Sequence, residues 1–182
     1  MMNPLLAVVL AATLPLGSVL SVDDSSSRLT FHVTHKLHRV EGESSSIEGK
    51  AMVRDGQVIT MVRVPVASFH SGDGNRDAHM QETLNVEKYP FIVWKGVAPL
   101  ESNNAVPSGK VNMAGRLEFH GVSRDVTVPL DVEPRPDGAL RIHGTLAVSL
   151  DEFRVDRPSL LFVKIDDTCR IDVDFVLKAA QP

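Results

Sequence analysis

The chain carries seven histidines, and three of them follow one another closely as His32, His35 and His38. Histidines near carboxylates are typical of zinc sites and of proton transfer. In one extended strand, however, alternate side chains point to opposite faces, so His35 is expected opposite His32 and His38. Zinc needs three or four convergent ligands, and the sequence offers no such set. We therefore predict no metal site and no resident cofactor.

Nucleophilic and acid–base catalysis have equally little support. The chain has no Gly-x-Ser-x-Gly motif, no close pair of carboxylates and a single cysteine, Cys169, with no activating neighbour. Cys169 has the spacing of an inward strand residue, which predicts an inert buried thiol. We expect a binding protein and no enzyme. The alternative is a metal-binding or lipid-converting barrel that uses His35 and its polar neighbours.

A further polar group lies between residues 71 and 88, where the strand pattern stops. The glycine-rich start is typical of a loop, and the rest of the segment is compatible with one or two helical turns capped by Asn75 or Asp77. An insertion of this length beside a barrel mouth is a natural lid. Arg76 and Asp77 can tie this loop to the barrel through local hydrogen bonds. The alternative is that Arg76 or His79 faces the head group of a ligand at the mouth.

These residues must be positioned by strands, because the dominant hydrophobic period of the chain is two. One apolar and one polar face, typical of an antiparallel sheet with one solvent-exposed side, alternate over residues 29–37, 58–66, 111–119, 126–132, 140–150 and 169–177. Turn chemistry separates several strands, at Asp55-Gly56, His120-Gly121 and Pro136-Asp137-Gly138.

Short strands at this spacing predict an all-β sandwich or barrel. A barrel is favoured because it leaves no exposed edges. The small inward residues Gly115 and Gly144 also leave interior space. His120, in its turn and with outward parity, is interpreted as structural.

Chain length and net charge exclude some classes of binding partner. The 182 residues suit one domain, and a formal net charge of −4 argues against a nucleic-acid partner. Lysines and arginines are scattered, without a run that would favour an anionic membrane surface. Partners are therefore expected to be small or neutral.

The first residues differ from the rest of the chain. Residues 1–22 contain no charged side chain, and the apolar stretch from Leu5 to Leu16 is too short to span a bilayer. It suits a secretory signal peptide, with cleavage after Ser21. We predict a leader over residues 1–21, a barrel domain over residues 22–182, a periplasmic or secreted location, and no stable membrane insertion after cleavage. An uncleaved, membrane-associated N-terminus is the alternative.

Four stretches in order resemble one known family. They are residues 31–43 (FHVTHKLHRVEGE), residues 68–96 (SFHSGDGNRDAHMQETLNVEKYPFIVWKG), residues 115–132 (GRLEFHGVSRDVTVPLDV) and residues 149–158 (SLDEFRVDRP). Together they resemble the YceI-like family. The resemblance implies an eight-stranded antiparallel lipocalin-like barrel with a short helical lid, periplasmic and without catalysis, whose apolar tunnel holds a polyisoprenoid.

We accordingly predict an exported lipid-binding protein that sequesters or carries a long isoprenoid, either a polyprenol or a quinone-like chain. A homodimer is compatible with the resemblance. Tyr89 and Phe91 differ in parity from Trp94, so that strand is expected to be covered on both sides or bulged. The ligand is expected to contact Phe31, Val33, His35, Phe69, Arg76, His79, Tyr89, Phe91, Trp94, Leu117 and Phe119.

Overall fold

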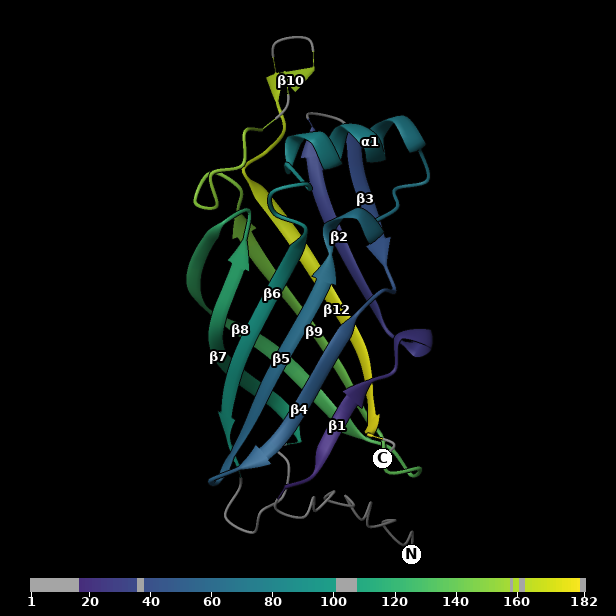
Figure 1. Cartoon of the computed structure of the whole chain (residues 1–182), viewed down its shortest axis with the longest axis vertical. Coiled ribbons are helices and arrows are strands. Elements are labelled where there is room, and N and C mark those ends of the chain that lie inside the picture. Colours follow the sequence, from purple (N-terminus) through teal and green to yellow (C-terminus); the bar gives the residue numbers. More distant parts are fainter. Residues whose placement is uncertain (1–16, 36–37, 101–107, 158, 161–162, 181–182) are drawn as a thin grey trace, which may run out of the picture.

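The computed structural model describes residues 17–35, 38–100, 108–157, 159–160 and 163–180. An antiparallel sheet closes into a barrel (Figure 1). Strand β1 pairs with both β4 and β12 and so closes the ring. This confirms the predicted eight-stranded barrel. The ring runs in spatial order through β1 (Val19–Val22), β4 (Glu48–Arg54), β5 (Gln57–Pro65), β6 (Phe91–Pro99), β7 (Gly109–Phe119), β8 (Val122–Pro134), β9 (Leu140–Ser149) and β12 (Thr168–Ala179).

Two further strands extend the sheet beyond β12, namely β2 (Arg28–His35) and β3 (His38–Ser44). An isolated bridge between Glu43 and His70 joins β3 to the segment before α1 (Gly74–Thr83). Helix α1 lies at the end of the barrel where β2 ends, opposite the turn between β4 and β5 (Figure 1). The remaining short elements are the 3-10 turns η1 (Asp24–Ser26) and η2 (Val66–Ser68) and the small hairpin of β10 (Ser159–Leu160) and β11 (Val163–Lys164).

Two tight hairpins fix the register of neighbouring strands. Arg54 pairs with Gln57, and Phe119 pairs with Val122, so each loop contains two residues. Both loop residues have positive φ in each hairpin: 51° and 74° at Asp55-Gly56, and 50° and 73° at His120-Gly121. These angles define the type I′ turn, whose twist matches that of the flanking strands. The predicted turns are confirmed at both places.

The two faces of the sheet separate apolar from charged side chains. On the outer face of β12, Asp172 accepts hydrogen bonds from His32 and Thr145 at 2.8 Å and from Arg170 at 2.9 Å. The neighbouring inward residues of β12 belong to the apolar interior. The outward carboxylate of Asp172 is thus hydrogen-bonded to residues of its own and neighbouring strands, while the alternate, apolar residues of β12 point into the barrel.

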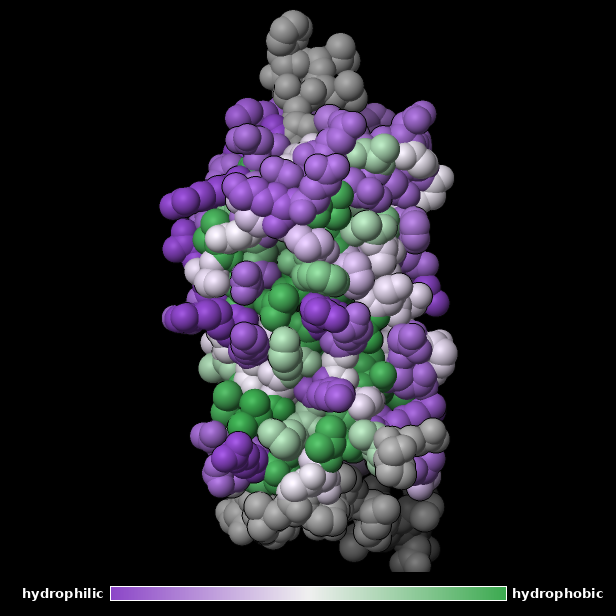
Figure 2. Space-filling view, viewed as in Figure 1, coloured by the Kyte–Doolittle hydropathy of each residue, from purple (hydrophilic) through white to green (hydrophobic). Residues whose placement is uncertain are grey.

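The outer face of β4, β5 and β6 is more mixed. Figure 2 shows apolar and charged side chains interspersed on this side of the molecule. The exposed large apolar residues are Ile59, Met61 and Val97. Within the described residues, no helix has the length and apolar character needed to cross a membrane.

Three sequence-based details require correction. The strand predicted over residues 29–37 ends at His35, and residues 36–37 lie outside the described part. Helix α1 has ten residues, and its N-cap is Asp73 in place of Asn75 or Asp77. The space expected above Gly115 and Gly144 is occupied, because a Cβ at either position would meet Trp94 or Leu130 at 2.6 Å.

Strand β1 lies across the predicted leader boundary. Cleavage after Ser21 would remove three of its four residues. One of them, Leu20, is only 3% exposed and belongs to the apolar core. Residues 1–16 lie outside the described part of the chain.

Candidate ligand-binding cavity

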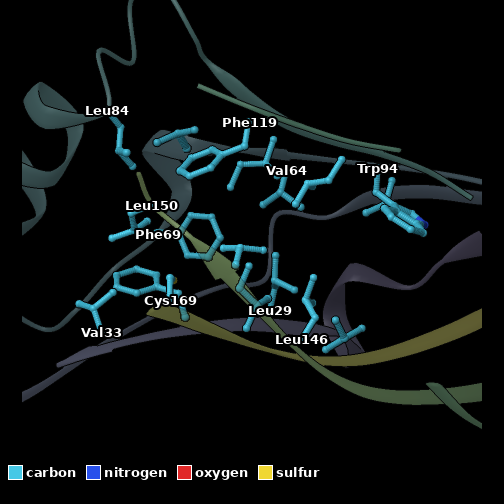
Figure 3. Close-up of a pocket in the computed structure, with 18 of the residues that line it drawn as sticks. Leu29, Val33, Val64, Phe69, Leu84, Trp94, Phe119, Leu146, Leu150 and Cys169 are labelled. Carbon is cyan, nitrogen blue, oxygen red and sulfur yellow. The ribbon is translucent and has the colours of Figure 1, made fainter. Parts of the chain in front are cut away.

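The interior of the barrel contains a cavity of about 680 Å³. This volume falls in the ordinary range of small-molecule sites, about 300–1,000 Å³. Inward residues of β2, β5, β6, β7, β9 and β12 form its wall, and most of them are aliphatic or aromatic (Figure 3). The wall therefore offers apolar contact along the bore and few groups that could hold a polar ligand.

Two apolar clusters surround the cavity. One includes Leu29, Val64, Phe69 and Phe175, each at most 8% exposed. The other includes Leu117, Leu150 and Phe153, of which Phe153 is 1% exposed. The partly buried residues packed on both clusters are Phe31, Ile92 and Ile171, so the clusters meet along one continuous bore.

Aromatic rings shape the wall at two levels. The rings of Phe31 and Phe69 pack at 59° with centroids 5.6 Å apart. Trp94 lies deeper in the bore, away from Leu84 (Figure 3). Its indole lies against Gly96 and Gly115, where an added Cβ would meet the ring at 2.6–2.7 Å. Because both positions are glycine, the large ring lies flat against the wall.

Polar lining residues gather at the end of the cavity beside α1. Apart from Lys50 and Thr60, they are His35, His38, Ser71, Arg76, Asp77, His79 and Thr83. Arg76, Met80, Thr83 and Leu84 have the spacing of one helical face, so α1 turns this face toward the cavity. The helix thus supplies both an apolar cover and the polar rim of the mouth.

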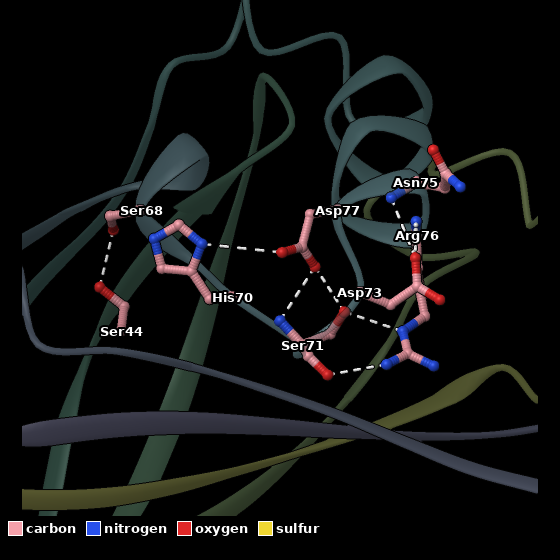
Figure 4. Close-up of polar contacts among 8 residues, drawn as sticks. All are labelled: Ser44, Ser68, His70, Ser71, Asp73, Asn75, Arg76 and Asp77. Carbon is pink, nitrogen blue, oxygen red and sulfur yellow. Dashed lines mark hydrogen bonds and ion pairs between the residues drawn. The ribbon is translucent and has the colours of Figure 1, made fainter.

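The start of α1 is held by a compact hydrogen-bond network (Figure 4). Asp73 caps the helix by accepting from the backbone N–H groups of Asn75 at 2.9 Å and Arg76 at 3.1 Å. Arg76 donates from Nε to Ser71 Oγ at 2.8 Å and from Nη2 to the Ser71 carbonyl at 2.7 Å. The guanidinium therefore ties the loop to the helix while it lines the mouth.

Asp77 is the second anchor of this network. Its Oδ1 accepts from the Ser71 hydroxyl and from the Ser71 N–H, the latter at 2.9 Å, and its Oδ2 lies 3.6 Å from His70 Nδ1. The Ser71 hydroxyl bond is the main cause that lowers the pKa of the Asp77 carboxyl. The carboxylate therefore stays ionised, and its oxygens interact with Ser71 and His70 of the loop before α1.

Nine of the eleven residues predicted to contact a ligand line the cavity: Phe31, Val33, His35, Phe69, Arg76, His79, Trp94, Leu117 and Phe119. The other two lie outside it. Tyr89 packs edge-on against His120, with centroids 4.8 Å apart. Phe91 faces outward on β6, where the Arg63 guanidinium covers its ring at 4.5 Å. Phe91 and Trp94 therefore point to opposite sides of β6. The outer side is not covered along its length, because Val97 on that side is 40% exposed, and the predicted cover on both sides is wrong.

The histidine prediction needs one correction. His35 and His38 are opposite one another in the β2–β3 pairing, and both line the cavity. Directly paired residues share a face, so the parity argument failed once the chain reversed between the two strands. His32 faces outward, as predicted.

Several residues that line the cavity were not among the eleven predicted from the sequence. Val62, Val64, Leu146 and Ile171 have the same inward parity as the residues that were chosen. The period-two pattern of the sequence already indicated that these residues point inward. The contribution of Met80 and Leu84 from α1 could not be found in that way, because it depends on how the helix docks.

A family model for the YceI-like domain matches residues 20–177. The chain belongs to the YceI-like family. A search of curated proteins finds no match to this YceI-like chain. The match begins within β1 and ends within β12, so it includes all eight strands of the ring.

Solved structures have the same fold as this YceI-like protein. Burkholderia cenocepacia BcnA is 19% identical, with a TM-score of 0.73 over 85% of this chain and 98% of that one. A polyisoprenoid-binding domain from Saccharophagus degradans, implicated in plant cell wall breakdown, is 16% identical, with a TM-score of 0.77 over 90% and 99%. The Campylobacter jejuni YceI protein is 17% identical, with a TM-score of 0.63 over 82% and 90%.

Across the residues that the structure describes, no three His, Cys, Asp or Glu side chains gather as metal ligands would. His120 belongs to a turn, where its Nδ1 lies 3.2 Å from the Phe153 carbonyl oxygen.

Cys169 lines the bore of this YceI-like protein (Figure 3), and burial raises the pKa of its thiol from 9.0 to about 11. At pH 8 the fraction of reactive thiolate should therefore be about 100-fold lower in the folded protein than in the unfolded chain. Alkylation by iodoacetamide, followed by mass spectrometry with and without urea, measures this difference. Equal rates in both states would contradict a buried, inert thiol.

Proposed function

We propose that this protein binds one long isoprenoid chain inside the barrel and sequesters or carries it. The observation that carries the proposal is the cavity of about 680 Å³, whose wall is apolar except near α1 and at Lys50 and Thr60. A ligand with a long hydrocarbon chain and a small polar end matches this distribution. Polyprenols and the tails of quinones have that form.

Burial of hydrocarbon provides the affinity. Each buried CH₂ group contributes about 0.8 kcal/mol, so one isoprene unit contributes on the order of 3–4 kcal/mol before ordering costs. A few units enclosed by the wall are enough for stable binding without any specific hydrogen bond. The preformed barrel lowers the ordering cost further, because its strands are fixed by the closed ladder.

The polar rim supports an assignment for the ligand's orientation. Arg76 and His79 line the mouth on the side of α1, and His35 and His38 line it on the side of β2 and β3. We place the polar end of the isoprenoid among these groups and its tail toward Trp94. Similarity in fold to the polyisoprenoid-binding domain of Saccharophagus degradans supports the same ligand class. The role is that of a binding protein, not an enzyme.

Trp94 offers a direct readout, because it is the only tryptophan in the chain and it lines the bore. Titration with a polyprenol is expected to shift its emission to shorter wavelength and to saturate at one ligand per barrel. A long-chain quinone should quench the same emission. Phe91→Trp combined with Trp94→Phe moves the reporter to the outer face of the same strand and should remove both responses. An unchanged Trp94 emission at saturating polyprenol and quinone would argue against the proposal.

We further propose that the protein acts outside the cytoplasm, with the apolar N-terminal stretch as a leader. Two backbone hydrogen bonds join residues 17–19 to the barrel, one from Gly17 N–H to the Val53 carbonyl and one from Ala180 N–H to the Val19 carbonyl. They favour cleavage before residue 17, because cleavage after Ser21 would remove both. The intact mass of protein from its host's envelope measures the start of the mature chain. A start at Val22 would place cleavage after Ser21, the site that the sequence pattern predicts.

A further inference from the structure

A second, smaller chamber of about 40 Å³ lies beyond the main cavity, at the barrel end opposite α1. Its far wall includes Leu20, Ala51, Val53 and Ala98, each at most 6% exposed. The chamber is large enough for a water molecule, but it offers almost no polar partner, so it is expected to be dry. The chamber thus has the same apolar lining as the main cavity.

A layer of side chains separates the two spaces. The residues that line both are Thr60, Met113, Leu130, Ile142 and Leu177. Two of them contact one another directly, because Thr60 Oγ1 lies 3.4 Å from Met113 Sδ. The same hydroxyl lies 3.3 Å from the Gly96 carbonyl oxygen, which ties Thr60 to the wall. The methionine therefore rests on a side chain that is itself held in place.

Met113 is the adjustable part of this layer. Its side chain is unbranched and it is 8% exposed, whereas the other three apolar members are branched aliphatic residues. When Met113 is in place, the main cavity ends at this layer. A shorter side chain at this position would remove part of the layer between the two spaces.

We propose that Met113, positioned by Thr60, is the floor of the tunnel and sets the longest isoprenoid chain that the barrel accepts. This inference rests on the proposed function and adds a specificity determinant to it. A shorter residue at position 113 enlarges the tunnel by the volume of the side-chain atoms that are removed, plus the volume of the chamber. The preferred ligand then gains isoprene units at its tail end, while its polar end stays at the mouth.

The test is a competition among polyprenols of graded chain length, with the bound species read by native mass spectrometry. Met113→Ala is expected to shift the preference to longer chains by about tenfold in the ratio of long to short, and Met113→Phe should shift it to shorter chains. Thr60→Val, which keeps the volume and removes the contact with sulfur, should broaden the distribution. Met61→Ala is the matched control, because Met61 is 48% exposed on the outer face of β5.

Circular dichroism and thermal unfolding identify which variants are folded. If Met113→Ala does not fold, Met113→Phe and Thr60→Val carry the test, since both keep the layer filled. The same chain-length distribution in wild type and in the folded Met113 and Thr60 variants would overturn the inference. Wild-type protein that takes up no polyprenol at all would overturn the proposed function itself, which is a distinguishable result.

Discussion

Leu146→Glu is expected to weaken isoprenoid binding by at least about 100-fold. Leu146 lines the bore from β9 and is paired with Ile171 of β12, so the new carboxylate would stand in the apolar wall (Figure 3). A bound lipid would strip water from this charge without supplying a partner, which costs several kcal/mol, and each 1.4 kcal/mol is a factor of about ten in affinity. Titration by Trp94 fluorescence measures the loss.

Ala147→Glu provides the matched control for this substitution. Ala147 is the next residue of β9 and is exposed on the outer face, opposite Arg170. The same charge there should leave binding unchanged. If Leu146→Glu does not fold, Leu146→Gln makes the same test with a neutral polar group. Equal affinities for folded Leu146 and Ala147 variants would contradict a lipid site in the bore.

Phe153→Ala is expected to lower the free energy of unfolding by about 3–5 kcal/mol. Its side chain is 1% exposed and packs on Phe119, with ring centroids 5.6 Å apart. Its carbonyl oxygen also lies 3.2 Å from His120 Nδ1, so the residue joins the segment after β9 to the β7–β8 turn. Domains of this kind have total stabilities of about 5–15 kcal/mol, so the loss is large. Urea denaturation followed by circular dichroism measures it.

Phe91→Ala is the control for the loss of a phenylalanine ring. Phe91 faces outward beneath Arg63 and is only partly buried, and removal of a cation–π contact of this kind costs about 1 kcal/mol. The two variants should therefore differ by several kcal/mol in the free energy of unfolding. A Phe153→Ala variant as stable as Phe91→Ala would show that the cluster around Phe153 does not anchor this end of the barrel.

The period-two pattern predicted six strands because their inward positions carry large apolar side chains. Strand β3 has no such pattern. Its buried positions are Gly42 and Ser44, and a Cβ at Gly42 would lie 2.5 Å from the Phe31 ring. The neighbouring strand fills the space, so the apolar signal of this position resides in Phe31 and not in β3. Strand β1 was hidden for a different reason, because it comes directly after the apolar N-terminal stretch.

The candidate site was predictable where one strand's parity decides direction, as at Phe31, Val33, Leu117 and Phe119. It was not predictable where the chain reverses. His38 joined the cavity because a hairpin set it opposite His35. The helical segment at the mouth was predicted from the glycine-rich break in the strand pattern. Its cap at Asp73 was not, since several Asp and Asn residues at this loop could each accept from the helix N-terminus.

The most direct test of isoprenoid binding is native mass spectrometry of the protein purified from its own host's envelope, followed by organic extraction. We predict a single bound molecule per barrel whose extract is a polyprenol or a long-chain quinone. The cavity wall predicts that this ligand survives purification in detergent-free buffer. Protein that is empty when isolated and takes up no added long-chain isoprenoid would contradict the proposed function.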